Sequence, residues 1–143
     1  NVLMDENTGL PVAVIDLDTV MKGSILYDFG DSIRSGTNTG AEDEKDLSKV
    51  DFSLELYEAY VKGFLSEVKE KLTETEKENL SFGAILMTFE CGMRFLTDYL
   101  QGDTYFKIHR EHQNLDRCRT QFKLVADMEE KWDVMNQIVE KYA

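Results

Sequence analysis

The chain contains little proline and little cysteine, and both shortages constrain its structure. Its 143 residues include one Pro and two Cys. A single Pro leaves long helices uninterrupted, and two cysteines are too few for a disulfide framework. Cys91 and Cys118 lie within apolar, helix-like patterns, so we expect buried free thiols rather than a disulfide or a metal pair. Free thiols indicate a reducing compartment, and we expect a cytoplasmic protein.

Basic residues are also scarce. The 16 Lys and Arg residues face 28 Asp and Glu residues, which gives a net charge of −12. Because phosphate neutralisation needs clustered Lys and Arg, this balance argues against nucleic acid or an anionic membrane as a partner. No run approaches the roughly 18 apolar residues of a membrane span, and no signal peptide is visible. The acidic runs 41–46 and 73–78 are expected to be solvated faces and helix caps.

Several catalytic motifs are missing from the sequence. It contains no Gly-rich phosphate loop, no Gly-x-Ser-x-Gly, no Cys-x-x-Cys and no His-Glu-x-x-His. The signatures of P-loop proteins, serine hydrolases, dithiol oxidoreductases and zinc peptidases are therefore absent. His109 and His112 have no Cys or further His nearby, so we expect surface histidines rather than metal ligands.

The first third of the chain predicts a hairpin followed by loops. Two short apolar runs, Asn1–Met4 and Val12–Asp16, flank the turn-forming segment DENTGLP. This pattern predicts a β hairpin over residues 1–16. Glycines then interrupt a loop-rich stretch to about residue 47, with a helical turn possible around Ser24–Ser35.

Helices are predicted for most of the remaining chain. Thr73 and Glu76 form a capping-box pattern, and Asn114 is expected to cap the last helix. Gly83 and Gly92 lie in an apolar stretch expected to be the buried central helix, where they would permit close packing. Residues 103–114 are expected to be irregular. The periodicity predicts helices over 51–68, 73–100 and 115–142, so the fold class is a single, mainly α domain with a short N-terminal hairpin.

Acidic residues follow the second strand of the predicted hairpin. Carboxylates at a strand end are a common way to hold a divalent cation beside a phosphate. Asp16 and Asp18 alternate across the strand, so only one of them can face a given ion. Asn1, on the partner strand, could supply a second oxygen ligand. The alternative is that both aspartates cap turns.

Two further features allow more than one interpretation. Asp28-Phe29-Gly30 matches the metal-binding motif of protein kinases, but no strand directly precedes it, so Asp28 is expected to cap a helix or pair with Arg34. Arg94 lies in an apolar helix, where an unpaired charge is costly. It needs an acidic partner, a carbonyl group or a ligand. Tyr105 could border a cleft or simply pack.

Four segments together resemble a known family. They are NVL, VAVIDLDTVMKGSILYDFGDSIR, AEDEKDLSKVDF and MTFECGMRFLTDYLQGDTYFKIHREHQNLDRCRTQFKLV. This combination resembles the C-terminal lobe of the N-acetylhexosamine 1-kinases, members of the aminoglycoside phosphotransferase and choline kinase group with a protein-kinase-like fold. The resemblance covers nearly the whole chain, and the last segment is its most specific part.

The resemblance implies roles for five residues. Asn1 is similar to the Mg²⁺-binding Asn that follows the catalytic Asp of this family. Asp16 takes the place of the metal-binding Asp after the next strand, and Asp18 is expected to help shape the nucleotide-metal site. Arg94 and Tyr105 are expected to contact the hexosamine. Mg²⁺ and ATP, as co-substrate, are the implied cofactors.

The resemblance also implies that the chain is a partial domain, residues 1–143 of a C-lobe. The catalytic His-x-Asp would lie just before Asn1, and the N-lobe with its phosphate-binding Lys would be absent. We expect the parent enzyme to phosphorylate the anomeric hydroxyl of an N-acetylhexosamine such as N-acetylglucosamine or N-acetylgalactosamine. The fragment alone is expected to be inactive, because phosphoryl transfer depends on complete positioning and charge stabilisation.

Other functions remain open at this point. The acceptor could be another small hydroxyl compound, such as an aminoglycoside or choline. Alternatively, the chain could be a non-catalytic helical binding or regulatory module whose acidic residues only cap turns. Self-association is a further expectation, through the surface that a missing N-lobe would cover.

Overall fold

A computed structural model of the chain describes residues 2–18 and 20–143. The part of the prediction that concerns Asn1 therefore lies outside the described residues. The described chain is mainly helical, with one two-stranded antiparallel sheet, which confirms the predicted fold class at this level. Its elements are β1 (Val2–Met4), β2 (Pro11–Val14), α1 (Ile25–Gly36), α2 (Leu54–Val68), α3 (Glu74–Glu78), α4 (Leu80–Leu100), α5 (Gln113–Glu130) and α6 (Trp132–Tyr142), with 3₁₀ turns at Leu47–Lys49 and Lys69–Lys71.

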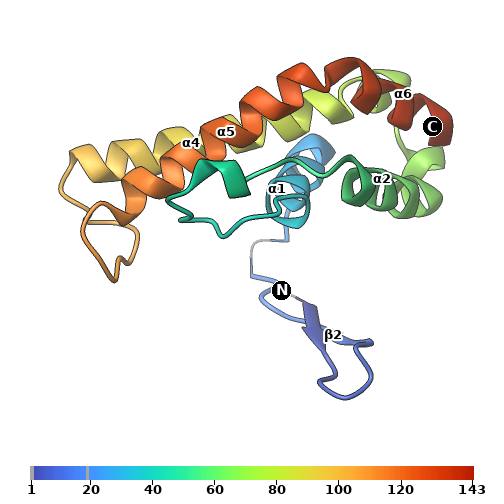
Figure 1. Cartoon of the computed structure of the whole chain (residues 1–143). Helices are drawn as coiled ribbons and strands as arrows, with labels where there is room; N and C mark the ends of the chain where they lie inside the picture. The colour runs from blue at the N-terminus through green and yellow to red at the C-terminus, as the bar shows by residue number, and fades with distance from the viewer. Residues whose placement is uncertain (1, 19) are drawn as a thin grey trace.

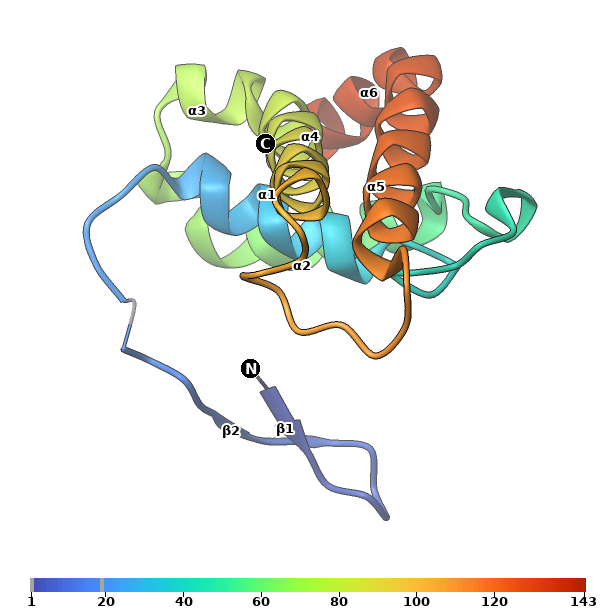
Figure 2. The same ribbon diagram turned by 90° about the vertical axis from the view of Figure 1, so that its left-hand side faces the viewer.

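The N-terminal hairpin is held together mainly by its own backbone and turn. Val2 pairs with Val14, and the register shifts after Leu3. The carboxylate of Asp5 closes the turn by accepting hydrogen bonds from the backbone N–H groups of Asn7 and Thr8 at 3.0 and 2.7 Å. Figures 1 and 2 show this hairpin set apart from the helices. Its side chains are accordingly exposed, apart from the half-buried Asp5.

Two long helices form the centre of the helical body. Helices α4 and α5 lie side by side, and α1 crosses beneath α4 (Figure 1). Helix α2 packs against α6 at the C-terminal end of the chain. Apolar burial between these helices is the main source of stability. The core includes Phe29, Ile33, Phe52, Tyr57, Val61, Leu65, Leu80, Leu124, Met128 and Met135.

Glycines set the distances between the central helices, as the sequence predicts. A Cβ atom on Gly30 of α1 would lie 2.3 Å from the carbonyl oxygen of Gly83 on α4. A Cβ atom on Gly92 would lie 2.7 Å from the ring of Phe122 on α5. Neither gap can hold a methyl group without displacing its neighbour.

Two predicted long helices are each divided in the structure. Asn79 ends α3 and precedes α4, because its side chain donates a hydrogen bond to the carbonyl of Thr75 at 2.7 Å. Lys131 separates α5 from α6, and its ammonium donates to the carbonyl of Phe52 at 2.7 Å and to Asp51 at 2.8 Å. The prediction of continuous helices was wrong at both points, because these contacts favour a change of direction over continued helix.

Helix α4 is also less buried than its apolar sequence predicts. Phe82, Leu86, Phe89 and Met93 are each between 37% and 47% exposed. They follow one another at helical spacing, so one side of α4 remains uncovered among the described residues. None of the helices in the described part of the chain combines the length and hydrophobicity needed to cross a bilayer.

The α1–α4 crossing gives a direct test of this packing. We expect Gly30→Ala to lower the free energy of unfolding by about 1–3 kcal/mol, because the new methyl group overpacks the contact with Gly83. Gly63→Ala is the matched control, since Gly63 lies in α2 with no neighbour within 4 Å of the added Cβ. This control is expected to stabilise the protein by about 0.5–1 kcal/mol. Urea denaturation of both variants measures the difference, and equal effects would contradict the crossing.

Candidate functional site

The structure brings Arg94 and Tyr105 together in one open hollow. The Arg94 guanidinium lies 5.9 Å from the centre of the Tyr105 ring and 5.4 Å from that of Phe106. These distances allow cation–π attraction. The hollow has a volume of about 350 Å³, and its lining is completed by Thr97, Asp98 and Gln101.

The buried carboxylate of Asp98 holds the loop that carries Tyr105. One oxygen accepts hydrogen bonds from the backbone N–H groups of Thr104 and Tyr105 at 2.9 and 2.8 Å. The other accepts from the N–H of Phe106 at 3.0 Å and from the side chain of Asn114 at 2.8 Å. A buried aspartate of α4 thereby joins the loop to the first turn of α5. Four hydrogen bonds also satisfy a charge that would otherwise be costly to bury.

Hydrogen bonding stabilises the charged form of Asp98. Burial by itself raises the pKa of this carboxyl, but the N–H groups of Phe106, Tyr105 and Thr104 together outweigh that effect and lower the pKa below its ordinary value. Hydrogen bonds to a carboxylate favour the ionised form. Asp98 therefore acts as a fixed anion that orders the loop.

The loop itself has the irregular conformation that the sequence predicts. Gly102 and Asp103 both have positive φ, 92° and 57°, directly after α4 ends. His112, at 60°, precedes α5 and makes no side-chain capping bond. The expected cap, Asn114, lies inside the helix instead, because its side chain bonds to Asp98 and Asp103.

Arg94 is more exposed to solvent than the apolar residues around it in the sequence would predict. Its side chain is 50% exposed, and its Nε atom lies 3.7 Å from Glu90, one turn earlier on α4. The expected acidic partner is therefore present, but the ion pair is weak and solvated. Much of the guanidinium remains available for a ligand in the hollow.

The two aspartates after β2 are not part of this hollow. Asp16 and Asp18 are exposed and lie beyond the end of the strand, and Asp16 has a left-handed backbone conformation with φ of 63°. Neither residue lines the cavities around Arg94. The residues predicted to bind the nucleotide and those predicted to bind the sugar thus lie on separate parts of the described chain.

The fit of this region to Mg²⁺ is partial. Asp16 and Asp18 offer the hard oxygen ligands that this ion prefers. Within residues 2–18 and 20–143, however, no group of three or more His, Cys, Asp or Glu side chains is arranged to hold a metal ion. The predicted ligand Asn1 lies outside the described residues.

Several smaller predictions are also decided. Asp28 was expected to cap a helix or to pair with Arg34. It lies in the first turn of α1, whose N-cap is Ser24, and Arg34 instead pairs with Asp31 at 2.9 Å and with Glu42 at 3.4 Å. His109 and His112 are exposed, as expected. Both cysteines are free; Cys118 is buried, whereas Cys91 is only half-buried because one side of α4 is uncovered.

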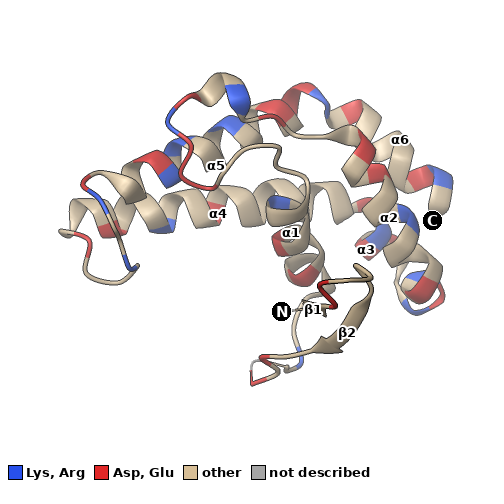
Figure 3. Ribbon diagram, turned by 60° about the horizontal axis from the view of Figure 1, so that its bottom comes forward, with Lys and Arg blue, Asp and Glu red and all other residues tan. Residues whose placement is uncertain are grey.

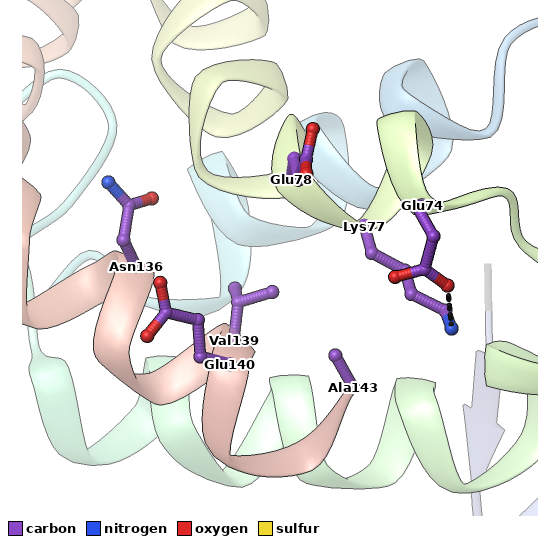
Figure 4. A pocket seen from close by; sticks show the side chains of 7 residues that line it. All are labelled: Glu74, Lys77, Glu78, Asn136, Val139, Glu140 and Ala143. Atoms are coloured by element: carbon purple, nitrogen blue, oxygen red, sulfur yellow. Dashed lines mark hydrogen bonds and ion pairs between the residues drawn. The ribbon is translucent and has the colours of Figure 1, made fainter.

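A larger cavity, of about 470 Å³, is lined by residues of α3 and α6 and by Ala143 (Figure 4), and Arg94 is not part of its lining. Its lining includes Glu74, Glu78 and Glu140, and its cation, Lys77, is paired with Glu74 at 2.9 Å. The lining contains no aromatic platform and no unpaired basic group for a sugar or a phosphate. This cavity therefore does not add to the candidate site.

Asp98 and Phe106 are functional candidates that the sequence analysis missed. An acidic residue in an otherwise apolar helix, shortly before the turn at Gly102, is a signal that could have identified Asp98. Phe106 carries no comparable signal. No protein-family model matches the chain, so a proposal about its function depends on this geometry and on the resemblance of its motifs.

The role of Asp98 can be tested through the pH dependence of stability. The ordinary pKa of an aspartate is 3.8, and that of Asp98 is lower in the folded protein. Its contribution to stability is therefore present at neutral pH and is lost as the pH falls below 3.8 through the folded-state pKa. We expect Asp98→Asn to be less stable at neutral pH, with the difference from wild type shrinking in acid.

Urea unfolding of both proteins between about pH 7 and pH 3 measures this difference. Asp133→Asn, at an exposed site in the first turn of α6, controls for the loss of one charge. A constant difference between wild type and Asp98→Asn across this range would contradict the assigned role.

Proposed function

We propose that this chain supplies the sugar-binding part of an ATP-dependent kinase that phosphorylates the anomeric hydroxyl of an N-acetylhexosamine. The observation that carries the proposal is the hollow in which Arg94 faces the rings of Tyr105 and Phe106. Sugars bind proteins through contacts of this kind, in which an aromatic face covers apolar C–H groups and a charged donor bonds to hydroxyl groups. The motif resemblance assigns the same Arg and Tyr to the hexosamine.

The chain's own residues have defined parts in this proposal. Asp98 fixes the loop, so the aromatic platform is ordered before the sugar binds. Arg94 orients the sugar, and its loose pairing with Glu90 leaves donors free. Such pre-organisation lowers the entropy cost of placing the reacting hydroxyl.

The nucleotide side of the proposal rests on Asp16 and Asp18, together with Asn1. Mg²⁺ would neutralise charge on the phosphates of ATP when bound. The two described carboxylates lie in the exposed segment after β2, where a nucleotide can reach them. The base that activates the sugar hydroxyl is assigned to an Asp outside this sequence, because the chain contains no His-x-Asp.

A helical binding module is the second candidate, and one observation favours it. Apolar residues of the hairpin are exposed, with Val12 at 67% and Val14 at 63%, as is the uncovered side of α4. Exposed apolar surface of this kind commonly marks a protein interface. Light scattering tests the associated prediction of self-association.

Sugar binding distinguishes the two candidates. We expect Arg94→Ala to weaken N-acetylglucosamine binding by about tenfold, because it removes charged hydrogen-bond donors. Tyr105→Ala is expected to weaken it by about fivefold through loss of the aromatic face. Arg119→Ala is the control, since this exposed arginine of α5 pairs with Asp116 outside the hollow. Chemical-shift titration of the labelled chain measures the affinities; equal affinities in all variants would contradict the proposal.

The catalytic part is tested separately. The 143-residue chain is expected to show no ATP-dependent phosphorylation of N-acetylglucosamine or N-acetylgalactosamine, because the proposal assigns the catalytic base and the phosphate-binding Lys to other residues of the parent enzyme. A longer parent protein is expected to catalyse the reaction, and Asp16→Ala is expected to abolish its Mg²⁺-dependent nucleotide binding with the fold retained. Turnover by the 143-residue chain, or unchanged nucleotide binding by the variant, would count against this assignment.

A further inference from the structure

A second pocket adjoins the hollow, and its lining holds four basic side chains beside the three carboxylates of Asp31, Glu42 and Glu90. Its volume is about 390 Å³, and it lies among α1, α4, α5 and the loop that carries Phe106. Figure 3 shows basic segments on α4 and α5 among the acidic ones. Of the 16 Lys and Arg residues in a chain of net charge −12, the lining includes Arg34, Arg94, Lys107 and Arg117.

The carboxylate of Glu42 lies between two of these arginines. One of its oxygens is 3.4 Å from Nη1 of Arg34, and the other is 3.4 Å from Nε of Arg117. Both distances are longer than the 2.7–2.9 Å that is usual for charge-assisted hydrogen bonds. Glu42 therefore marks a position that favours an oxyanion, without filling it tightly.

The two arginines are held in place by other contacts. Arg34 is bound by Asp31 at 2.9 Å, and its side chain is only 15% exposed. Arg117 donates to the side chain of Asn114 at 2.9 Å and to the carbonyl of Lys107 at 3.3 Å. The guanidinium groups are thus pre-organised independently of Glu42, which lowers the cost of binding a ligand there.

Arg117 also has an unused donor. Its Nε atom is buried and has no hydrogen-bond partner among the described residues, because its contact with Glu42 lacks hydrogen-bond geometry. A buried donor without an acceptor is costly and uncommon in folded proteins. An oxyanion that approaches more closely than Glu42 would satisfy it.

The side chain of Glu42 is able to leave this position. It is 46% exposed, whereas the backbone carbonyl of the same residue is fixed by a hydrogen bond from Thr120. Rotation of the side chain into solvent would therefore open the space between the arginines without unfolding the loop.

The pocket lies next to the sugar hollow, because Arg94 and Phe106 line both cavities. A substituent of a ligand in the hollow would therefore have to pass Arg94 to reach Arg34 and Arg117.

We infer that the sugar bound here carries an anionic substituent, a phosphate, sulfate or carboxylate group, which Arg34 and Arg117 hold in place of Glu42. This inference rests on the proposed sugar-binding function and specifies its substrate class. Planar guanidinium groups suit such oxyanions, because they can donate two parallel hydrogen bonds. The same groups disfavour a cationic acceptor such as an aminoglycoside or choline, because like charges repel.

The test compares three sugars with the same pyranose ring on the full 143-residue chain. They are N-acetylglucosamine, its 6-phosphate and glucosamine, which are neutral, anionic and cationic. Chemical-shift titration is expected to show that the 6-phosphate binds at least about tenfold more tightly than the neutral sugar, and glucosamine more weakly. This advantage should shrink as NaCl is added, because salt screens charge. Inorganic phosphate, as a separate probe, should compete with the 6-phosphate.

Variants assign the effect to the two arginines. Arg34→Gln and Arg117→Gln are each expected to reduce the ratio of the affinity for the anionic sugar to that for the neutral sugar at least about threefold. Glu42→Gln is expected to raise the ratio, because it removes the competing carboxylate. Arg34→Lys keeps the positive charge but loses the planar guanidinium group, so an intermediate ratio is expected.

Lys45→Gln is the control, because this lysine lines a separate cavity with Tyr99 and Arg119. Circular dichroism confirms that each variant is folded.

The outcomes separate the inference from the function on which it rests. Equal affinities for the neutral and anionic sugars, both weakened by Arg94→Ala, would overturn the anionic substituent and leave the proposed function standing. Affinities that neither Arg94→Ala nor Tyr105→Ala changes would overturn both. An anionic advantage that persists in both Arg34→Gln and Arg117→Gln would overturn the assignment to this pocket.

Discussion

The hydrogen bonds to the carboxylate of Asp98 are the interaction on which the candidate site depends. Asp98 belongs to α4. Its carboxylate oxygens accept hydrogen bonds from three successive backbone N–H groups of the following loop and from the side chain of Asn114 on α5. A buried carboxylate is tolerated only when such donors surround it. The same bonds that satisfy the charge therefore place Tyr105 and Phe106 beside Arg94.

Helix packing supplies the frame for this arrangement. Gly30 and Gly83 let α1 approach α4, which brings Arg34 close to the face of α4 that carries Cys91 and Arg94. The close approach of Phe122 to Gly92 sets α5 beside the same helix. Charged side chains from three helices consequently border one pocket, although the chain as a whole is strongly acidic.

The hairpin contrasts with this frame. Its turn is closed by Asp5, and its apolar side chains face solvent. Few contacts join the hairpin to the helices, so the hairpin contributes little to the hydrophobic core. The residues predicted to bind the nucleotide, Asp16 and Asp18, follow this hairpin. Those predicted to contact the sugar, Arg94 and Tyr105, belong to α4 and to the loop that Asp98 holds.

The sequence by itself determined the helical class, the hairpin, the capping box at Thr73 and the role of glycine in close packing, because these follow from local periodicity and backbone chemistry. It did not determine the breaks at Asn79 and Lys131, since a distant contact such as that between Lys131 and Phe52 redirects the chain. Only the tertiary structure placed Arg94 against aromatic rings and gathered Arg34 and Arg117 around Glu42. These side chains come from separate helices, and their distances depend on how those helices cross.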